Sequence, residues 1–252
     1  MLAIDLTGRL ALVTGATSEL GRGMVRTLAK AGADVVVHYN SNQSMAKMLC
    51  EQIKQLGRRS MIVQADITQK DSIASMQQQI ADELGEPDIL VNNAVIQYQW
   101  TKVLQQDAAD YEGQFRSCVL QNVFMAQTFV PAMIQKGYGR FIGINTECTM
   151  QASPNQSAYI AGKAGMDRTL RVLAKEVGEH GITVNQVAPG WTISENRPDT
   201  EATEDYTSKV PLQRRGETQE IANVVAFLAS DLASYMTGTY IPVCGGNVMP
   251  AI

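Results

Sequence analysis

The chain has 252 residues, of which 45 % are hydrophobic and 18 % charged, and its formal net charge is −4. This balance is typical of a globular protein with a large core, and we expect residues 1–252 to form a single domain. The modest acidity argues against a nucleic-acid partner, because a phosphate-binding surface needs a basic stripe. The four cysteines are far apart and the two histidines lie in unrelated segments, so we expect no metal site.

The N-terminal segment and the length of the apolar runs indicate where in the cell the protein is expected. Residues 1–9 contain Asp5 and Arg9 and no long apolar run, which does not fit a signal peptide. No stretch approaches the roughly 18 continuous apolar residues of a membrane span. We therefore expect a cytoplasmic protein without a membrane partner, whose cysteines stay reduced.

Short apolar runs alternate with helical patterns along the whole chain. In chain order we expect a strand at Leu10–Thr14, a helix ending near Ala31, a strand at Asp34–Tyr39, a helix at Met45–Leu56, a strand at Ser60–Gln64, a helix at Asp71–Leu84, a strand at Asp88–Asn92, a helix at Tyr111–Lys136, a strand at Arg140–Asn145, a helix at Gln156–Gly178, a strand at Thr183–Val187, a helix at Glu217–Ser230 and a strand at Tyr240–Val243.

This alternation predicts βαβ units with right-handed crossovers. The fold class is therefore α/β: a single-domain, Rossmann-type, doubly wound parallel sheet of about seven strands, with helices on both faces. Ligands of such sheets bind beyond the carboxyl ends of the strands, at the switch point in strand order. The residues that directly follow each strand are therefore the candidates for a functional site.

A glycine-containing turn, Thr14-Gly15-Ala16-Thr17-Ser18-Glu19-Leu20-Gly21, follows the first strand and opens the first helix. Such a turn lets backbone N–H groups meet a pyrophosphate at a helix N-terminus. Taken alone, the segment is equally compatible with an ordinary turn between a strand and a helix.

Later segments add motifs in the same order as a known family. Asn92-Asn93-Ala94 follows the fourth strand, Tyr159-Ile160-Ala161-Gly162-Lys163 lies on the helix after the fifth, and Pro189-Gly190 ends the sixth. With the glycine turn and with Asp66 after the third strand, the chain resembles the short-chain dehydrogenase/reductase family over nearly its whole length. It is similar to 3-oxoacyl-acyl-carrier-protein reductases and to related sugar or alcohol dehydrogenases.

The resemblance implies an oxidoreductase that transfers a hydride between NAD(P)(H) and a carbonyl or secondary-alcohol substrate. Tyr159 would exchange a proton with the substrate oxygen. Lys163 lies four residues later on the same helix face and would lower the pKa of that tyrosine. The family places a serine 13 residues before the tyrosine, and here Thr146 supplies the hydroxyl group. The catalytic candidates are therefore Tyr159, Lys163 and Thr146.

The resemblance also implies which residues hold the cofactor. These candidates are Gly15, Thr17, Ser18, Glu19, Leu20, Gly21, Tyr39, Asn40, Ser41, Asp66, Ile67, Asn93, Ala94, Tyr159, Lys163, Pro189, Gly190, Thr192 and Ser194. The second strand ends in Tyr39-Asn40-Ser41 without the aspartate typical of NAD binding, which favours NADP(H) slightly over NAD(H). Glu19 gives the opposite indication, since its carboxylate can accept hydrogen bonds from ribose hydroxyls.

Four positions depart from the family pattern, namely Glu19, Val95, Val119 and Thr146. Glu19 replaces a glycine beside the expected pyrophosphate, where it would be repelled unless it turned to solvent. Val95 adds bulk beside the cofactor. Val119 replaces an asparagine that orients a water in the family's proton relay. Asn122 lies nearly one turn away, and we interpret it as a polar helix position in preference to a substitute.

Further expectations concern the substrate and the assembly. Gln97, Trp100, Glu147, Cys148, Gln151 and Trp191 should lie near the pocket, and residues 195–209 should form a flap loop over it. If Glu147 faces the pocket, a polar, hydroxyl-bearing substrate fits better than a fatty chain. A homotetramer would form through Tyr111–Lys136, Gln156–Gly178 and Tyr240–Val243, as is common in the family. A non-catalytic nucleotide-binding or scaffold protein is the alternative hypothesis, and it rests on Glu19, Val95 and Val119.

Overall fold

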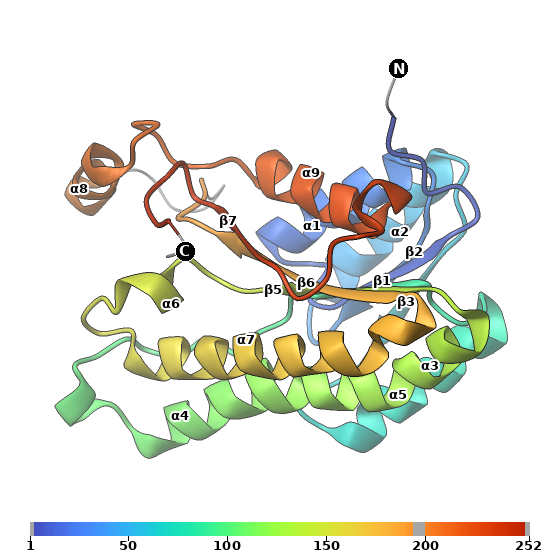
Figure 1. The fold of residues 1–252 in the computed structure, drawn as a ribbon, viewed down its shortest axis with the longest axis horizontal. Helices are drawn as coiled ribbons and strands as arrows, with labels where there is room; N and C mark the ends of the chain where they lie inside the picture. The colour runs from blue at the N-terminus through green and yellow to red at the C-terminus, as the bar shows by residue number, and fades with distance from the viewer. Residues whose placement is uncertain (1–2, 194–199, 250–252) are drawn as a thin grey trace.

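The computed structural model describes residues 3–193 and 200–249, and within them the chain forms one parallel sheet between two layers of helices (Figure 1). The described strands occur in the order β3-β2-β1-β4-β5-β6-β7. Their bounds are β1 (Leu10–Val13), β2 (Asp34–Tyr39), β3 (Ser60–Gln64), β4 (Ile89–Asn92), β5 (Gly139–Ile144), β6 (Ile182–Pro189) and β7 (Tyr240–Val243). The predicted α/β fold is confirmed, and each strand lies within one or two residues of its expected position.

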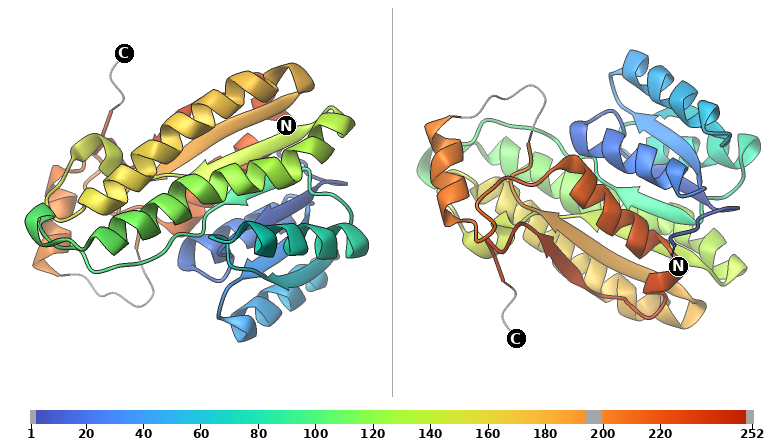
Figure 2. Two further views of the ribbon diagram at one scale, coloured as in Figure 1. Left: turned by 90° about the horizontal axis from the view of Figure 1, so that it is seen from below. Right: turned by 90° about the horizontal axis from the view of Figure 1, so that it is seen from above.

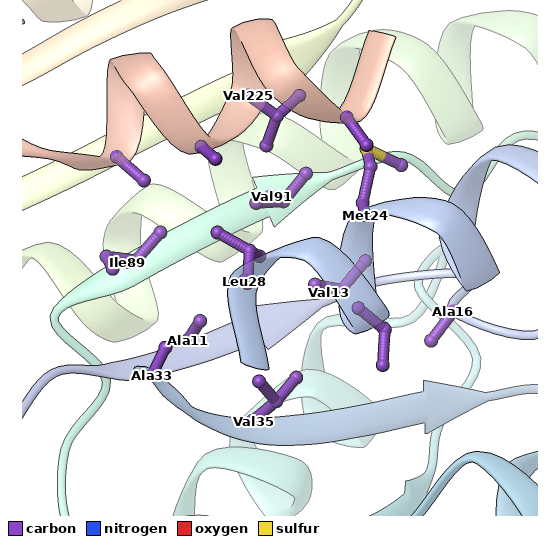
Figure 3. Packing of buried hydrophobic residues seen from close by; sticks show 14 of the residues in the cluster. Ala11, Val13, Ala16, Met24, Leu28, Ala33, Val35, Ile89, Val91 and Val225 are labelled. Carbon is purple, nitrogen blue, oxygen red and sulfur yellow. The ribbon is translucent and has the colours of Figure 1, made fainter. Parts of the chain in front are cut away.

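Helices cover both faces of this sheet. Their bounds are α1 (Glu19–Lys30), α2 (Gln43–Gln55), α3 (Lys70–Glu83), α4 (Ala108–Gln114), α5 (Gln121–Lys136), α6 (Cys148–Gln151), α7 (Ser157–Val177), α8 (Glu201–Lys209) and α9 (Thr218–Ala229). On one face, α1, α2 and α9 pack a core that includes Met24, Leu28 and Val225 (Figure 3). On the other, α3, α5 and α7 lie side by side over a second core (Figure 2, left). Buried on both faces, the central strands are continuous apolar runs, as parallel strands require.

The strand order places the site. β1 pairs with β2 on one side and with β4 on the other, so the connections that leave β1 and β4 run in opposite directions. A crevice therefore opens between the loops that follow these two strands.

Two helices, α2 and α4, begin two or three residues earlier than the apolar pattern predicts, and a side chain caps each of them. The Asn42 side-chain oxygen accepts a hydrogen bond from the backbone N–H of Met45 at 3.1 Å, and α2 begins at Gln43. Asp107 caps α4 in the same way, through the N–H of Ala109. Neither α6 nor α8 is predicted. α8 occupies the described second half of the segment expected to be a flap loop.

The long helix from Ala108 to Lys136 is interrupted by a π-helical segment, Phe115–Leu120, between α4 and α5. By length and composition this helix is apolar enough to cross a membrane, although no stretch met our criterion of continuous apolar residues. Half of its most apolar window is buried inside the fold, where it packs against α3 and α7. Its apolar character therefore has an explanation in the core.

Candidate active site

A cleft of about 990 Å³ follows the carboxyl ends of the strands. Most of the predicted cofactor residues line it, namely Gly15, Thr17, Ser18, Glu19, Leu20, Asn40, Ser41, Asp66, Ile67, Asn93, Ala94, Tyr159, Lys163, Pro189, Gly190 and Thr192. Gly21 and Tyr39 do not line it, and both are buried in the fold. Ser194 lies outside the described residues.

The turn after β1 is built for close backbone packing. The Ser18 hydroxyl oxygen accepts a hydrogen bond from the Gly21 N–H at 3.1 Å and so caps α1. A Cβ atom at Gly21 would lie 2.3 Å from the Gly15 carbonyl oxygen, and Gly15 itself has a φ of +61°. Larger residues at these two positions would displace the turn. The N-terminus of α1, with its partial positive charge, consequently opens onto the cleft.

Hydrogen bonds of Asn93 connect the turn after β1 to the end of β4. Its side-chain amide donates hydrogen bonds to the carbonyl oxygens of Thr14, at 2.9 Å, and of Gly15, at 3.1 Å. The Thr14 hydroxyl oxygen accepts hydrogen bonds from the backbone N–H groups of Asn93 and Ala94. The two walls of the crevice are therefore held at a fixed separation.

His38 is a residue of this site that the sequence analysis missed. It is 1 % exposed, its Nδ1 accepts the Gly15 N–H at 3.0 Å, and its Nε2 lies 3.1 Å from the Ala65 carbonyl oxygen. The first contact makes Nδ1 the acceptor, so Nε2 carries the proton and donates to Ala65. Burial lowers the pKa of His38 to about 4, and the ring is neutral near pH 7. A neutral histidine thus links the glycine turn to the end of β3.

The shape and polar groups of the cleft suit a bound dinucleotide, whereas the charge of Glu19 opposes its binding. The glycine turn and the helix N-terminus suit a pyrophosphate, and Asn40 and Ser41 offer polar groups beyond β2. Glu19 is the first residue of α1 and lines the same cleft, where its negative charge opposes a bound anion. It is only partly buried, so water screens much of that repulsion.

The three catalytic candidates come together at the inner end of the cleft. Tyr159 and Lys163 lie on one face of α7, and Thr146 follows β5. The Thr146 side chain lies close enough to the Tyr159 hydroxyl to oppose, in part, the rise in its pKa. The Lys163 Nζ atom is buried, donates to the Ile144 carbonyl oxygen at 2.6 Å, and lies 5.9 Å from the centre of the Tyr159 ring.

The expected effect of Lys163 on Tyr159 is not found in this structure. Burial raises the pKa of Tyr159, and nearby thiols add to that rise. Burial also lowers the pKa of Lys163. Both groups are removed from water, and burial disfavours the charged form of each, the phenolate and the ammonium. The Tyr159 hydroxyl is therefore held in its protonated form.

Val119 lies in the π-helical segment and is buried against α7, where a Cβ atom at Gly165 would lie 2.8 Å from it. Asn122 does not replace the missing asparagine. Its amide donates to the Cys118 carbonyl oxygen at 2.6 Å, and its oxygen accepts from Asn92 at 2.8 Å. Asn122 is thus a buried structural residue that joins the helix to β4.

A second cavity, of about 520 Å³, adjoins the first and shares Thr146 and Tyr159 with it. All six residues expected near the pocket line it: Gln97, Trp100, Glu147, Cys148, Gln151 and Trp191. Residues that were not individually singled out also line it, among them Tyr98, Gln156, Tyr206, Lys209 and Asn247. Tyr206 and Lys209 belong to α8, so the described part of the expected flap does border the cavity.

Aromatic rings and a buried carboxylate shape this second cavity. The Trp100 ring stacks on Tyr159 with centroids 5.9 Å apart, and Trp191 meets Tyr206 edge-on at 5.4 Å. Glu147 is 3 % exposed, and its two oxygens accept from the Tyr206 hydroxyl at 2.9 Å and from the Asn247 amide at 3.0 Å. Burial raises the pKa of Glu147 against the opposing effect of these hydrogen bonds.

A cleft that suits a dinucleotide meets a smaller pocket at a tyrosine and a threonine, with a lysine in the cleft beside them, and this arrangement fits a nicotinamide-dependent oxidoreductase of Rossmann type. A family model described as enoyl-(acyl carrier protein) reductase matches residues 15–247. The chain belongs to the short-chain dehydrogenase/reductase family.

Individual relatives cover nearly the full chain. A 3-oxoacyl-(acyl-carrier-protein) reductase of Staphylococcus epidermidis is 34 % identical over 251 residues, which cover 95 % of this chain and 98 % of the relative. The corresponding reductase of Pseudomonas aeruginosa is also 34 % identical, covering 98 % of this chain and all of the relative. A solved gluconate 5-dehydrogenase from Burkholderia cenocepacia, in complex with NADP and tartrate, is 27 % identical with a TM-score of 0.91, covering 97 % of this chain and 96 % of that chain.

Proposed function

We propose that this protein interconverts a carbonyl compound and its secondary alcohol, with Tyr159, Lys163 and Thr146 as the catalytic residues. One observation carries the proposal. Tyr159 and Thr146 line both cavities, so their hydroxyl groups lie where a nicotinamide in the larger cleft would meet a substrate in the smaller one. This junction is where an oxygen atom must accept a proton as its carbon accepts a hydride.

The bound nicotinamide supplies the hydride for reduction and accepts it in the reverse direction. Tyr159 donates its hydroxyl proton to the substrate oxygen as negative charge develops there. Burial keeps this hydroxyl protonated, which is the form that donates, and at the same time makes it a weaker acid. Thr146 positions the same oxygen through its hydroxyl group. Lys163 holds α7, and with it Tyr159, against the end of β5 through its hydrogen bond to the Ile144 carbonyl oxygen.

We propose a small, polar, hydroxyl-bearing substrate in preference to a fatty chain. Glu147 does line the pocket, and three glutamines, Gln97, Gln151 and Gln156, line it as well. The buried Gln156 Oε1 atom has no hydrogen-bond partner within the described residues, which leaves an acceptor for a substrate hydroxyl. A 3-oxoacyl group on an acyl carrier protein, as named for the reductase relatives, is the competing substrate class.

We propose NADP(H) as the preferred cofactor over NAD(H). The lining residues after β2, Asn40 and Ser41, carry no negative charge that would repel a 2′-phosphate. The gluconate 5-dehydrogenase relative is described with NADP bound, which supports the same choice.

A non-catalytic nucleotide-binding role is the second candidate, and Glu19 and Val119 favour it. The experiment that separates the two is a titration of the protein with NADPH and NADH, read as the change in melting temperature. A clear shift followed by turnover in a screen of ketones, sugars and acyl thioesters supports the enzyme. A shift without turnover of any of them supports nucleotide binding alone, and no shift with either cofactor at millimolar concentration contradicts the proposed cofactor dependence.

We further propose that the protein acts in the cytoplasm as a homotetramer, without a nucleic-acid or membrane partner. The helices expected at the interface expose apolar side chains, with Phe115 51 % and Val172 55 % exposed. β7 is the edge strand of the described sheet, and its partner on the open side would be a second copy. Light scattering during size-exclusion chromatography tests this assembly.

A further inference from the structure

Glu147 occupies an unusual position for a carboxylate. It directly follows Thr146, it is almost fully buried, and its backbone N–H donates to the Pro189 carbonyl oxygen at 3.0 Å. Within the described residues its side-chain partners are Tyr206 and Asn247, a phenol and an amide, both neutral. Burying a charge without an opposite charge is costly, so its two hydrogen bonds must offset much of the desolvation.

The two partners come from segments far away in the sequence. Tyr206 belongs to α8 and is 59 positions from Glu147, while Asn247 belongs to the C-terminal segment and is 100 positions away. Both segments lie at the end of the molecule where α6 also lies (Figure 1). Since Tyr206 and Asn247 line the smaller cavity, Glu147 holds two parts of the wall that surrounds the substrate.

The Tyr206 hydroxyl joins this wall to the cofactor cleft as well. It accepts the backbone N–H of Trp191 at 2.9 Å while it donates to Glu147. A Cβ atom at Gly190 would lie 2.7 Å from this hydroxyl and 2.9 Å from the Cys244 Cα atom. Gly190 therefore leaves the space that the hydroxyl needs, and Gly190 and Trp191 line both cavities.

We infer that Glu147 is a positioning residue, which fixes α8 and the C-terminal segment against the loop that carries Thr146. Both carboxylate oxygens are engaged by the protein, so the side chain acts through Tyr206 and Asn247 and not on the reacting atoms. The consequence for turnover rests on the proposed function. Loosening this contact widens the substrate pocket and weakens substrate binding, while Tyr159, Lys163 and Thr146 keep their places.

The contact can be tested without any substrate, by hydrogen–deuterium exchange of the NADP-bound protein. The variants are Tyr206→Phe, Asn247→Ala and Glu147→Gln, and Tyr235→Phe is the matched control because Tyr235 is fully exposed. The peptides to follow cover α8 and residues 244–249, and α9 serves as the internal reference. We expect exchange in α8 to become at least about tenfold faster in Tyr206→Phe, because this variant loses both the bond to the Glu147 carboxylate and the bond from the Trp191 N–H. We expect Asn247→Ala to act mainly on residues 244–249.

Two results would overturn the inference. One is unchanged exchange of α8 in Tyr206→Phe and Glu147→Gln alike, and the other is equally faster exchange in α9, which would indicate general destabilisation. Tyr206→Phe keeps the test valid if the buried Glu147 variant fails to fold.

Kinetics give a second, separate readout once a substrate is known. The inference predicts a KM about tenfold higher in Tyr206→Phe, with kcat nearly unchanged. A fall in kcat at unchanged KM would instead assign Glu147 and Tyr206 to the chemical step and overturn the positioning role. If no substrate is turned over, the proposed function fails, whereas the exchange result still decides whether Glu147 holds α8.

Discussion

The Nζ atom of Lys163 donates a 2.6 Å hydrogen bond to the carbonyl oxygen of Ile144, the last residue of β5. This bond anchors α7 to the strand that leads directly into Thr146. The side-chain amide of Asn145 adds a bond to the Lys163 carbonyl oxygen at 3.1 Å. The relative positions of Tyr159 and Thr146 are therefore set by the junction between β5 and α7, a rigid part of the core.

Replacing Tyr159 by phenylalanine removes the proposed proton donor and leaves the ring stacked under Trp100. We expect kcat to fall by about 10²–10⁴-fold, the usual contribution of a positioned acid or base. The melting-temperature shift caused by NADPH should be nearly intact, because the cofactor cleft keeps its shape. Unchanged turnover of this variant would rule out the proposed mechanism.

Thr146 is expected to act through its hydroxyl group. Thr146→Ser keeps that group and should keep most of the activity, whereas Thr146→Ala should lower kcat by about a hundredfold, as removal of one preorganised donor does elsewhere. Steady-state kinetics of both variants provide the comparison. Equal losses in the serine and alanine variants would show that the methyl group, and hence packing, is the important feature.

Glu19→Gln should tighten cofactor binding, because it removes a negative charge beside the expected pyrophosphate. A Coulomb repulsion of roughly 1 kcal/mol at about 4 Å in water corresponds to about fivefold in the dissociation constant. The gain should shrink at high salt. Glu176→Gln, an exposed position near the far end of α7, is the control. Weaker binding of NADH by Glu19→Gln would indicate that Glu19 accepts ribose hydroxyls.

His38 makes stability depend on pH. Its folded-state pKa, about 4, lies below the unfolded value near 6.5, so the unfolded chain binds the proton first as the pH falls. The stability due to neutral His38 is complete above pH 6.5 and is lost between about pH 6.5 and 4, for a total of about 3 kcal/mol.

His38→Asn retains an acceptor for the Gly15 N–H but cannot titrate. Denaturant unfolding from pH 8 to pH 4 should therefore show a flatter profile for the variant than for the parent protein. Carboxylates titrate in both proteins, so the difference between the two profiles isolates His38. Parallel profiles would mean that His38 does not carry this dependence.

The sheet and the catalytic candidates could be predicted from the sequence because their signals are local. β-branched runs such as Val35-Val36-Val37 mark buried strands, and Tyr159 and Lys163 share a face because four residues make about one helical turn. The early starts of α2 and α4 depend on single caps at Asn42 and Asp107, which an apolar pattern does not register.

The missed parts of the site depend on contacts between distant segments. His38 reaches Gly15 across 23 positions, and the sequence shows only a polar residue inside an apolar strand. Tyr206 and Asn247 lie 59 and 100 positions from Glu147 in the sequence and meet it only through the fold. The predicted lowering of the Tyr159 pKa by Lys163 was wrong for a related reason. Spacing along a helix does not show how deeply that face of the helix is buried, and burial raises the pKa.

The π-helical segment at Phe115–Leu120 has a consequence for the register of the whole site. A π turn accommodates one residue more than an α turn, and each residue of an α-helix accounts for about 100° of rotation. The extra residue thus sets the angle at which α4 presents Gln114 to its neighbours. Gln114 donates to the Ile96 carbonyl oxygen at 2.7 Å, and its backbone leaves no room for a Cβ atom at Gly162. The number of residues in this segment therefore affects both the rim of the substrate pocket at Ile96 and the packing of α7 beside Lys163. An insertion or deletion here should disturb the site more than a substitution would.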